Sequence, residues 1–323
     1  MVFDISKLPN DPANDHGRNA ADYNDGPPCG KLTAAMRFLS LQSHVAYGYV
    51  GNRAATFPLQ RLGHEVWAVN TVEFSNHTGY GAWRGRTAPA DQVAEIVQGI
   101  EALGLLPSCD ALLTGYVGDA ALADVVLDTA RRVRAANPRA IWCCDPVLGD
   151  IDTGIYVKPG IDVFFRERAI PAADLVTPNH FELEHLTGCT VSTMSEALTA
   201  ARSLLGGPKL GGPRLALITS LRRADAPADR IEMVAVSSDA AWRVATPLIG
   251  FEIAPNGTGD TVAALFTAHW LAGDDVADAL GRAASSIFAV LQTTHELGER
   301  ELQLVAAQDR LISPPRRFTA EKL

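Results

Sequence analysis

The chain has 323 residues, of which 47% are hydrophobic and 20% are charged, so it can bury the core of one large domain or two smaller ones. Its formal net charge of −9 argues against a nucleic-acid partner, because phosphate backbones are bound by clustered Lys and Arg. The cysteines are odd in number and lack CxxC spacing, which argues against a disulfide framework or a zinc site. No apolar run is long enough to cross a bilayer, and no signal peptide is recognisable, so we expect a cytoplasmic protein without a membrane partner.

Residues 1–35 are rich in Asp, Asn, Pro and Gly, and they are expected to form a disordered extension ahead of one folded domain at 36–323. In this domain, strand-like and helix-like patterns alternate. Strands are predicted at 37–42, 64–69, 111–114, 140–144, 175–177 and 214–219, with an antiparallel hairpin between 231 and 246. Helices are predicted at 50–62, 91–103, 120–137, 181–186, 258–272, 276–291 and 299–311. This order predicts an α/β fold with a mainly parallel central sheet and helices on both of its faces.

The segment 70–81 is polar and aromatic and contains glycines, which is too irregular for a core element. We expect it to form a mobile flap, or small lid, over a site. In an open parallel sheet, such a site lies beyond the carboxyl ends of the strands. Polar residues follow several of the predicted strands and should meet at one edge: Ser43, Tyr116, Asp145, Asn179 with Glu182, and Thr219.

The turn at 255–261 reads PNGTGDT and runs into the apolar stretch 262–266. Its glycines let the backbone approach a ligand, and a helix that begins here presents unpaired N–H groups suited to an anion. A carboxylate at Asp260 would repel a bound phosphate, so we expect it to take a proton from an attacking hydroxyl. The backbone of Gly257, Thr258, Gly259 and Asp260 would then stabilise the transferred phosphoryl group. The alternative is that Asp260 only caps the helix.

The chain has neither GxxxxGK[ST] nor a GxGxxG after its first strand, so a nucleotide would have to be held in another way. The Gly- and Pro-rich run at 206–212 is predicted to be a surface loop. Asp145 and Glu182 could hold Mg²⁺, directly or through water, although each could instead be a helix cap or a surface acid. His44 and His77 lack a third ligand at metal spacing, which favours hydrogen bonding or stacking to a flat substrate.

With this α/β order, the GTGD turn at 257–260 resembles the ribokinase superfamily, and more closely its pyridoxal kinases of vitamin B6 salvage. The resemblance runs from about residue 37 to the C-terminus. It also rests on SHVAYG at 43–48, NTV at 70–72 with FSNHT at 74–78, CDPV at 144–147, and TPN at 177–179 with ELE at 182–184. It implies a ribokinase-like kinase domain that uses ATP and Mg²⁺ and forms a homodimer, and it leaves a monovalent cation open.

The resemblance also implies roles for individual residues. Ser43, Thr78 and Gly79 would contact the pyridine ring and its substituents, with His77 and Tyr116 nearby, and Asp260 would deprotonate the 5′-hydroxymethyl group. The nucleotide side would comprise Asp145 and Glu182 with Mg²⁺, Thr177 and Thr219 at phosphate oxygens, and Thr246, Pro247, Leu248 and Ile249 beside the adenine. Thr219-Ser220 departs from the pattern, because close bacterial relatives carry a lysine there.

Our leading hypothesis is an ATP-dependent kinase of pyridoxal, with pyridoxine and pyridoxamine as further candidate substrates. A hydroxymethylpyrimidine kinase of thiamine synthesis is the nearest alternative, and the aromatic flap at 74–80 favours pyridoxal over it. A non-catalytic B6-vitamer-binding protein is a third alternative. The intact GTGD turn argues against it, because a pure binder gains nothing from a carboxylate beside phosphate.

Overall fold

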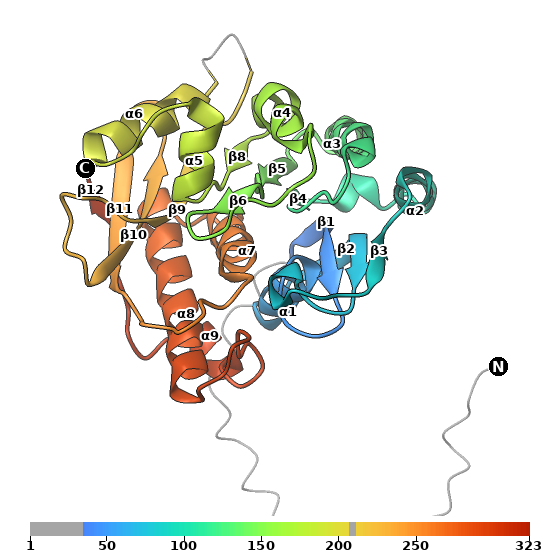
Figure 1. The fold of residues 1–323 in the computed structure, drawn as a ribbon. Helices are drawn as coiled ribbons and strands as arrows, with labels where there is room; N and C mark the ends of the chain where they lie inside the picture. Colours follow the sequence, from blue (N-terminus) through green and yellow to red (C-terminus); the bar gives the residue numbers. More distant parts are fainter. Residues whose placement is uncertain (1–34, 207–210) are drawn as a thin grey trace, which may run out of the picture. The chain divides into compact units, whose positions relative to one another are not determined.

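The computed structural model describes residues 35–206 and 211–323 (Figure 1). Nearly all of the extension predicted at 1–35, and most of the loop predicted at 206–212, lie outside the described residues. Ala35–Leu323 form one compact unit. In the described ranges, no helix combines the length and the hydropathy needed to cross a bilayer.

The strands are β1 (Arg37–Val45), β2 (Glu65–Phe74), β3 (Gly85–Thr87), β4 (Ala111–Thr114), β5 (Ile141–Cys144), β6 (Gly149–Asp150), β7 (Gly154–Ile155), β8 (Leu175–Val176), β9 (Leu215–Leu221), β10 (Arg230–Val236), β11 (Ala241–Pro247) and β12 (Glu321–Lys322). The helices are α1 (Asn52–Arg61), α2 (Ala90–Ala102), α3 (Ala123–Ala136), α4 (Ile161–Phe164), α5 (His180–Thr187), α6 (Met194–Leu204), α7 (Thr258–Leu271), α8 (Val276–Glu296) and α9 (Gln308–Ile312), with a short 3₁₀ helix, η2, at Thr78–Tyr80.

The main sheet has the strand order β12-β11-β10-β9-β8-β5-β4-β1-β2-β3. Pairing is parallel from β2 through β1, β4, β5 and β8 to β9. It is antiparallel where β3 joins one end and where β10, β11 and β12 extend the other. The predicted mainly parallel sheet is therefore confirmed, as is the predicted hairpin, which is β10–β11.

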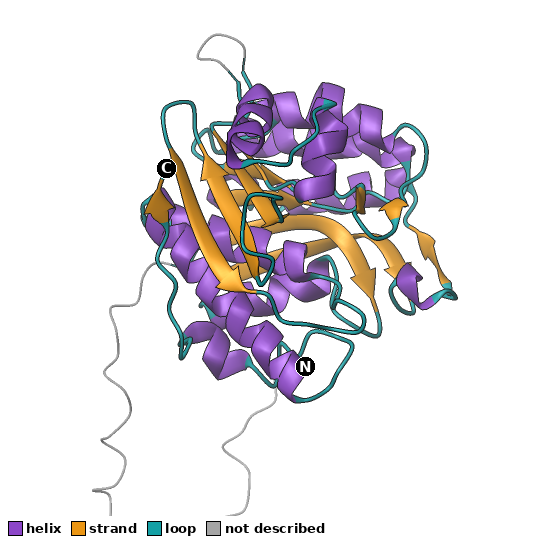
Figure 2. Cartoon of the chain, turned by 60° about the vertical axis from the view of Figure 1, so that its left-hand side comes forward, coloured by secondary structure: helices purple, strands orange, loops and turns teal. Residues whose placement is uncertain are grey.

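Both faces of the sheet are buried, as its inner strands require. Successive side chains of a strand point to opposite faces, and in β5 Ile141 and Cys143 join one core cluster while Trp142 and Cys144 join the other. Residues of α1, α7, α8 and α9 pack into the first cluster, and residues of α2 to α6 into the second. Figure 2 shows the resulting three layers, with helices on both faces of the sheet.

The flap prediction was wrong at its start. Residues 70–74 belong to β2, which stays paired with β1 as far as Phe74. Thr71 and Val72 are buried, and the polar side chain of Asn70 is satisfied by Asn52 and Glu73. The irregular segment is therefore shorter than predicted and carries the η2 helix.

The last predicted helix, 299–311, was also largely wrong. α8 runs on to Glu296, with Leu297 as its C-cap residue. Gly298 then has a φ of 66°, a left-handed conformation that stops a right-handed helix. Only Gln308–Ile312 is helical beyond it. The side chains of Glu301, Leu302 and Leu304 are all buried although no helix covers them, so the apolar residues that suggested a helix pack from an irregular segment.

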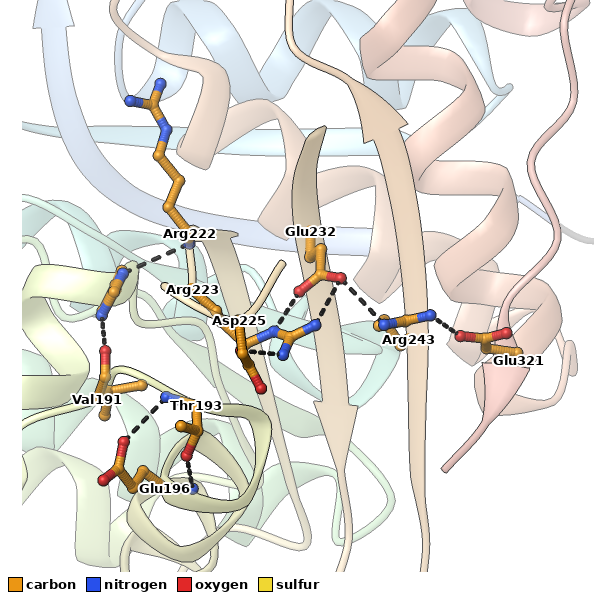
Figure 3. Close-up of polar contacts among 10 residues, drawn as sticks. Val191, Thr193, Glu196, Arg222, Arg223, Asp225, Glu232, Arg243 and Glu321 are labelled. Atoms are coloured by element: carbon orange, nitrogen blue, oxygen red, sulfur yellow. Dashed lines mark hydrogen bonds and ion pairs between the residues drawn. The ribbon is translucent and has the colours of Figure 1, made fainter. Parts of the chain in front are cut away.

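A chain of alternating charges crosses the antiparallel end of the sheet (Figure 3). Arg223 donates to both carboxyl oxygens of Glu232, at 2.7 and 3.1 Å, and Glu232 also accepts from Arg243 at 3.2 Å. Arg243 in turn pairs with Glu321 of β12. The side chains of Arg223 and Glu232 are only 5% and 4% exposed, so this cluster fastens the segment after β9 to the strands beside it.

Candidate active site

The polar residues that were predicted to follow the strands lie side by side, at the edge where the parallel strands have their carboxyl ends. Backbone hydrogen bonds connect each to the next: Asp145 N donates to Thr114 O at 2.8 Å, Thr177 N to Cys144 O at 3.2 Å, and Thr219 N to Pro178 O at 2.9 Å. The segments that follow β4, β5, β8 and β9 are thus held in one row. This is the edge at which the strand order predicts a ligand.

A pocket of about 100 Å³ opens at this edge. Its lining residues come from β1, β2, the η2 segment, the start of α7, the loop before α1 and the segments that follow β4, β5 and β7. They are Ser43, Val45, Val50, Val72, Phe74, His77, Thr78, Tyr116, Val147, Tyr156, Asn256, Gly257 and Asp260. The structure therefore brings together the predicted vitamer residues Ser43, His77, Thr78, Tyr116 and Asp260. Mixed apolar and aromatic walls with a few convergent polar groups are typical of small-molecule sites.

Two residues predicted beside the substrate, Gly79 and His44, do not line the pocket. Gly79 is exposed and does not line the pocket, and its carbonyl oxygen accepts a hydrogen bond from Arg300 at 3.0 Å. The side chain of His44 also lies outside the lining. Its Nδ1 is 2.9 Å from Oε2 of Glu73 in an exposed contact.

The turn before α7 has the geometry of an anion site. Gly257 is the N-cap residue of α7, has a φ of 82°, and provides no side-chain cap, so the first-turn N–H groups remain available. A Cβ atom at Gly257 would lie 1.8 Å from the carbonyl oxygen of Tyr49, so only glycine fits there. The positive end of the helix dipole adds to the attraction for an anion at this point.

Asp260 lies in the first turn of α7 but does not cap the helix. Its Oδ2 accepts a hydrogen bond from the backbone N–H of Gly51 at 2.9 Å, and the side chain lines the pocket. Burial raises the pKa of Asp260 above its usual range, although the bond from Gly51 lowers it in part. A half-buried carboxylate with a raised pKa, facing a pocket, is suited to accept a proton near neutral pH.

Asp145 and Glu182 form a buried acidic pair behind this turn, 7% and 3% exposed. Burial raises the pKa of Asp145 well above its usual range, and the charges of Glu182 and Asp260 raise it further. Burial likewise raises the pKa of Glu182 to about 8. The carboxylates therefore lie close enough to repel one another. A bound cation would balance their negative charge, which makes the pair a candidate cation site.

Glu182 also caps its own helix, which is one of the alternatives that the sequence left open. Its Oε2 accepts from Asn179 N at 2.9 Å and its Oε1 from Leu148 N at 2.9 Å, while Asn179 accepts from Glu182 N in a capping box. Asp145 is less constrained, since the Thr177 hydroxyl donates to its Oδ1 at 3.0 Å. Within 35–206 and 211–323, no group of three or more His, Cys, Asp or Glu side chains is arranged to hold a metal.

The predicted nucleotide residues fall into two groups. Thr177 and Thr219 are both buried. The Thr177 hydroxyl donates to Asp145, and Thr219, within β9, forms an isolated bridge with Asn179. Ser220 follows with a φ of 54°, an uncommon conformation for a non-glycine residue. Residues 246–249 lie at and just beyond the end of β11, where Thr246 is buried and Pro247, Leu248 and Ile249 are half-buried. They do not line the pocket.

Several residues of the site were missed by the sequence reasoning. Gly51, the partner of Asp260, lies 209 residues from it along the chain, and Tyr156 follows the unpredicted β6–β7 hairpin. Val45 and Val50 look like ordinary core residues in the sequence. The one available signal was Gly51 itself, because a glycine in the first turn of the helix predicted at 50–62 suggests an unusual backbone conformation there.

The fold and the site together define a kinase of the ribokinase-like class. The model of the phosphomethylpyrimidine kinase family matches residues 85–304. Pyridoxal kinase PdxY of Rubrobacter xylanophilus is 55% identical over 289 residues, covering 89% of this chain and 98% of that protein. PdxY of Deinococcus radiodurans is 50% identical, covering 90% and 98%. The pyridoxal kinase of Leishmania donovani, solved with ADP and ginkgotoxin, is 32% identical with a TM-score of 0.81, covering 89% and 99%. The chain therefore belongs to the pyridoxal kinase family.

Proposed function

We propose that this protein transfers the γ-phosphoryl group of ATP to the 5′-hydroxyl of pyridoxal, giving pyridoxal 5′-phosphate and ADP. The observation that carries the proposal is the pocket in which Asp260 and the α7 turn face Ser43, His77, Thr78 and Tyr116. The family supports it, since the Leishmania donovani enzyme was solved with ADP together with pyridoxamine and with pyridoxine. These two vitamers are accordingly proposed as further substrates.

In this proposal Asp260 is the general base. It takes the proton of the 5′-hydroxyl as the oxygen forms a bond to phosphorus and the bond from phosphorus to the β-phosphate oxygen breaks. The N–H groups of residues 257–260 stabilise the charge of the migrating phosphoryl group. Ser43, Thr78 and Tyr116 orient the ring, so that the rate gain comes mainly from positioning and charge stabilisation.

We propose that Asp145 and Glu182 lie on the side of the nucleotide and Mg²⁺. The residues fit this ion, because they offer buried carboxylate oxygens whose negative charges repel one another, and because Mg²⁺ keeps several waters and needs few protein ligands. Glu182 would act through water, since backbone N–H groups already engage both of its oxygens. When bound, Mg²⁺ neutralises charge on the transferring phosphates.

The remaining nucleotide contacts are proposed at Thr177 and Thr219 for phosphate oxygens and at residues 246–249 for the adenine. The domain at 36–323, a homodimer and a cytoplasmic location are also proposed, and they rest on the family resemblance. A monovalent cation stays open as a further cofactor.

Phosphorylation of a hydroxymethylpyrimidine is the second candidate, favoured by the family model that matches residues 85–304. ADP release measured against a panel of B6 and pyrimidine alcohols tests both. A higher kcat/KM for pyridoxal supports the first proposal, and a higher value for the pyrimidine replaces it by the second. Binding of pyridoxal without any ADP release would instead support a non-catalytic vitamer-binding protein.

A further inference from the structure

The segment after α8 contacts residues that neighbour the substrate pocket, although no pocket-lining residue comes from it. Arg300 and Glu301 both contact the η2 segment, residues 77–81, which we call the flap tip. Glu301 is buried, at 4% exposure. Such burial is uncommon for a glutamate and requires hydrogen-bond partners.

Glu301 joins two segments that each lead into a wall of the pocket and that both lie far from Glu301 in the sequence. Its Oε1 accepts from the Tyr80 hydroxyl at 2.7 Å, across 221 residues, and its Oε2 accepts from Tyr49 N at 3.2 Å, across 252 residues. The close approach is built in, because Gly48 has a φ of 93° and a Cβ atom there would lie 2.3 Å from Oε2. Each carboxyl oxygen of Glu301 thus has a partner in a different segment beside the pocket.

Arg300 holds the flap tip from the other side. Its guanidinium lies over the Tyr80 ring, 3.7 Å from the centroid, and its Nη2 donates to Gly79 O at 3.0 Å. The Tyr80 ring also packs edge-to-face with Tyr47, with centroids 6.1 Å apart. Tyr80 is therefore fixed at its hydroxyl, at its face and at its edge.

These contacts act on the pocket through neighbouring residues. His77 and Thr78, at the start of the flap tip, line the pocket, and Gly79 N donates to His77 Nδ1 at 3.1 Å, which sets the orientation of that ring. On the opposite wall, Tyr49 leads into Val50, which lines the pocket, and into Gly51, which holds Asp260. Glu301 thus sets the separation between the side chains above the substrate and the segment that orients the base.

We propose that Glu301, supported by Arg300 and Tyr80, is a positioning residue that clamps the flap tip to the 46–51 loop and so sets the affinity for the vitamer. This inference rests on the proposed function. It assigns no contact with substrate to these residues. The clamp lies on the vitamer side of the pocket, so its loss should affect vitamer binding more than ATP binding.

The test compares steady-state kinetics of Glu301→Ala, Glu301→Gln, Tyr80→Phe and the wild type, with Glu296→Ala as a matched control. Glu296 is an exposed glutamate that pairs with Arg310 and does not touch the flap tip. Glu301→Ala should raise KM for pyridoxal by about tenfold and change KM for ATP by less than about twofold. Tyr80→Phe, which keeps the ring, should raise KM for pyridoxal by a smaller factor in the same direction.

Glu301→Gln should restore KM to within about threefold of the wild type, because its carbonyl oxygen can accept from Tyr49 N while its amide donates to the Tyr80 oxygen. Amide hydrogen exchange at residues 77–81 should be faster in Glu301→Ala than in the wild type or Glu296→Ala, which reports on the clamp without any turnover. Unchanged KM for pyridoxal in both Glu301→Ala and Tyr80→Phe would overturn the inference. An equal rise of both KM values with a lowered Tm would overturn it too, since that pattern marks a purely structural role.

Failure of the two proposals can be told apart. A wild-type protein that releases no ADP with pyridoxal contradicts the proposed function, whatever the variants do. A wild-type protein that is active, with Glu301→Ala indistinguishable from it in KM and in hydrogen exchange, contradicts only the clamp.

Discussion

The backbone N–H of Gly51 donates to Oδ2 of Asp260 at 2.9 Å, joining the entry to α1 to the first turn of α7. This bond orients the carboxyl group so that it lines the pocket instead of capping its own helix. Asp260 is thus oriented by a backbone group that is distant in the sequence. This arrangement suits a functional carboxyl group better than one that only stabilises its own helix.

Asp260→Asn should therefore lower kcat by at least about a hundredfold with a smaller effect on KM, because the amide keeps the shape but cannot accept the proton. Steady-state ADP release measures both constants. Asp309→Asn, at an exposed surface pair with Arg61, is the control and should retain full activity. A kcat within about threefold of the wild type would exclude Asp260 as the base.

The raised pKa of Asp260 predicts the acid limb of the pH–rate profile. The base must be ionised to act, so kcat/KM should fall as pH is lowered through the raised pKa, and the midpoint should lie above the ordinary carboxyl range near about 4. The profile of kcat/KM for pyridoxal under saturating ATP measures it. A kcat/KM that stays constant down to about pH 4 would contradict a buried base with a raised pKa.

The acidic pair predicts how stability depends on pH. Folding raises the pKa values of Asp145 and of Glu182, to about 8 for the latter, so both bind protons more tightly when folded. Their contribution is fully present below the ordinary carboxyl pKa and is lost as pH rises toward about 8, so this term lowers Tm of the ligand-free protein over that window.

Asp145→Asn removes one of these charges and should raise Tm at pH 8 by about 2 °C or more while it lowers activity. Thermal unfolding at several pH values with and without Mg²⁺ and ADP checks this. With the ligands present, the wild-type Tm should depend less on pH, because the cation balances the charge. A Tm for Asp145→Asn at pH 8 below that of the wild type would contradict the repulsion.

Alanine substitutions at Gly257 and Gly259 are a matched pair of variants that test the role of the turn before α7. Gly257→Ala would place a Cβ atom 1.8 Å from Tyr49 O at a φ of 82°, whereas a Cβ atom at Gly259 meets nothing within 4 Å. Gly257→Ala should lose about 2 kcal/mol or more of folding free energy. Gly259→Ala should fold normally and yet lower kcat/KM for ATP by at least about tenfold, because its methyl group occupies the space for the phosphate.

Denaturant unfolding and ADP release separate these two effects. A Gly259→Ala variant with full activity would mean that the transferred phosphate does not pass close to this turn.

Glu232 tests the charge cluster at the antiparallel end. Removal of its carboxyl group in Glu232→Ala leaves the buried Arg223 with only the half-exposed Asp225 as an ion-pair partner, which should cost about 3 kcal/mol. Glu65→Ala, at an exposed pair with Arg37, should change stability by less than about 0.5 kcal/mol. Urea unfolding measures the free energy of unfolding of the two variants. Equal losses of this free energy would contradict the idea that the buried ion pair contributes more than the exposed one.

The sequence was most informative where local pattern and tertiary environment agree. Strand 111–114 was predicted with the bounds of β4 because its residues are apolar on both faces, as a central parallel strand requires. Residues 70–74 were predicted as flap because Asn70 and Glu73 are polar, and their partners, Asn52 and the neighbouring strand, are not visible locally.

The same reasoning explains which parts of the site were predictable. Asp260 stood out because GTGD combines glycine spacing with a carboxylate at a helix start. Ser43 stood out as a polar residue after a predicted strand, and Thr78 entered through the family resemblance. Glu301 gave no such signal. Its importance comes from contacts across 221 and 252 residues, and the helix predicted over it would have pointed Arg300 and Glu301 in different directions.

β12 closes one margin of the main sheet with Glu321 and Lys322, which pair with Arg243 and Trp242 of β11. Removal of these last residues would leave the outward N–H and C=O groups of β11 open to water and to other chains. Shortened versions of the protein, or versions with a bulky tag fused directly after Leu323, should therefore be more prone to self-association through strand addition at β11.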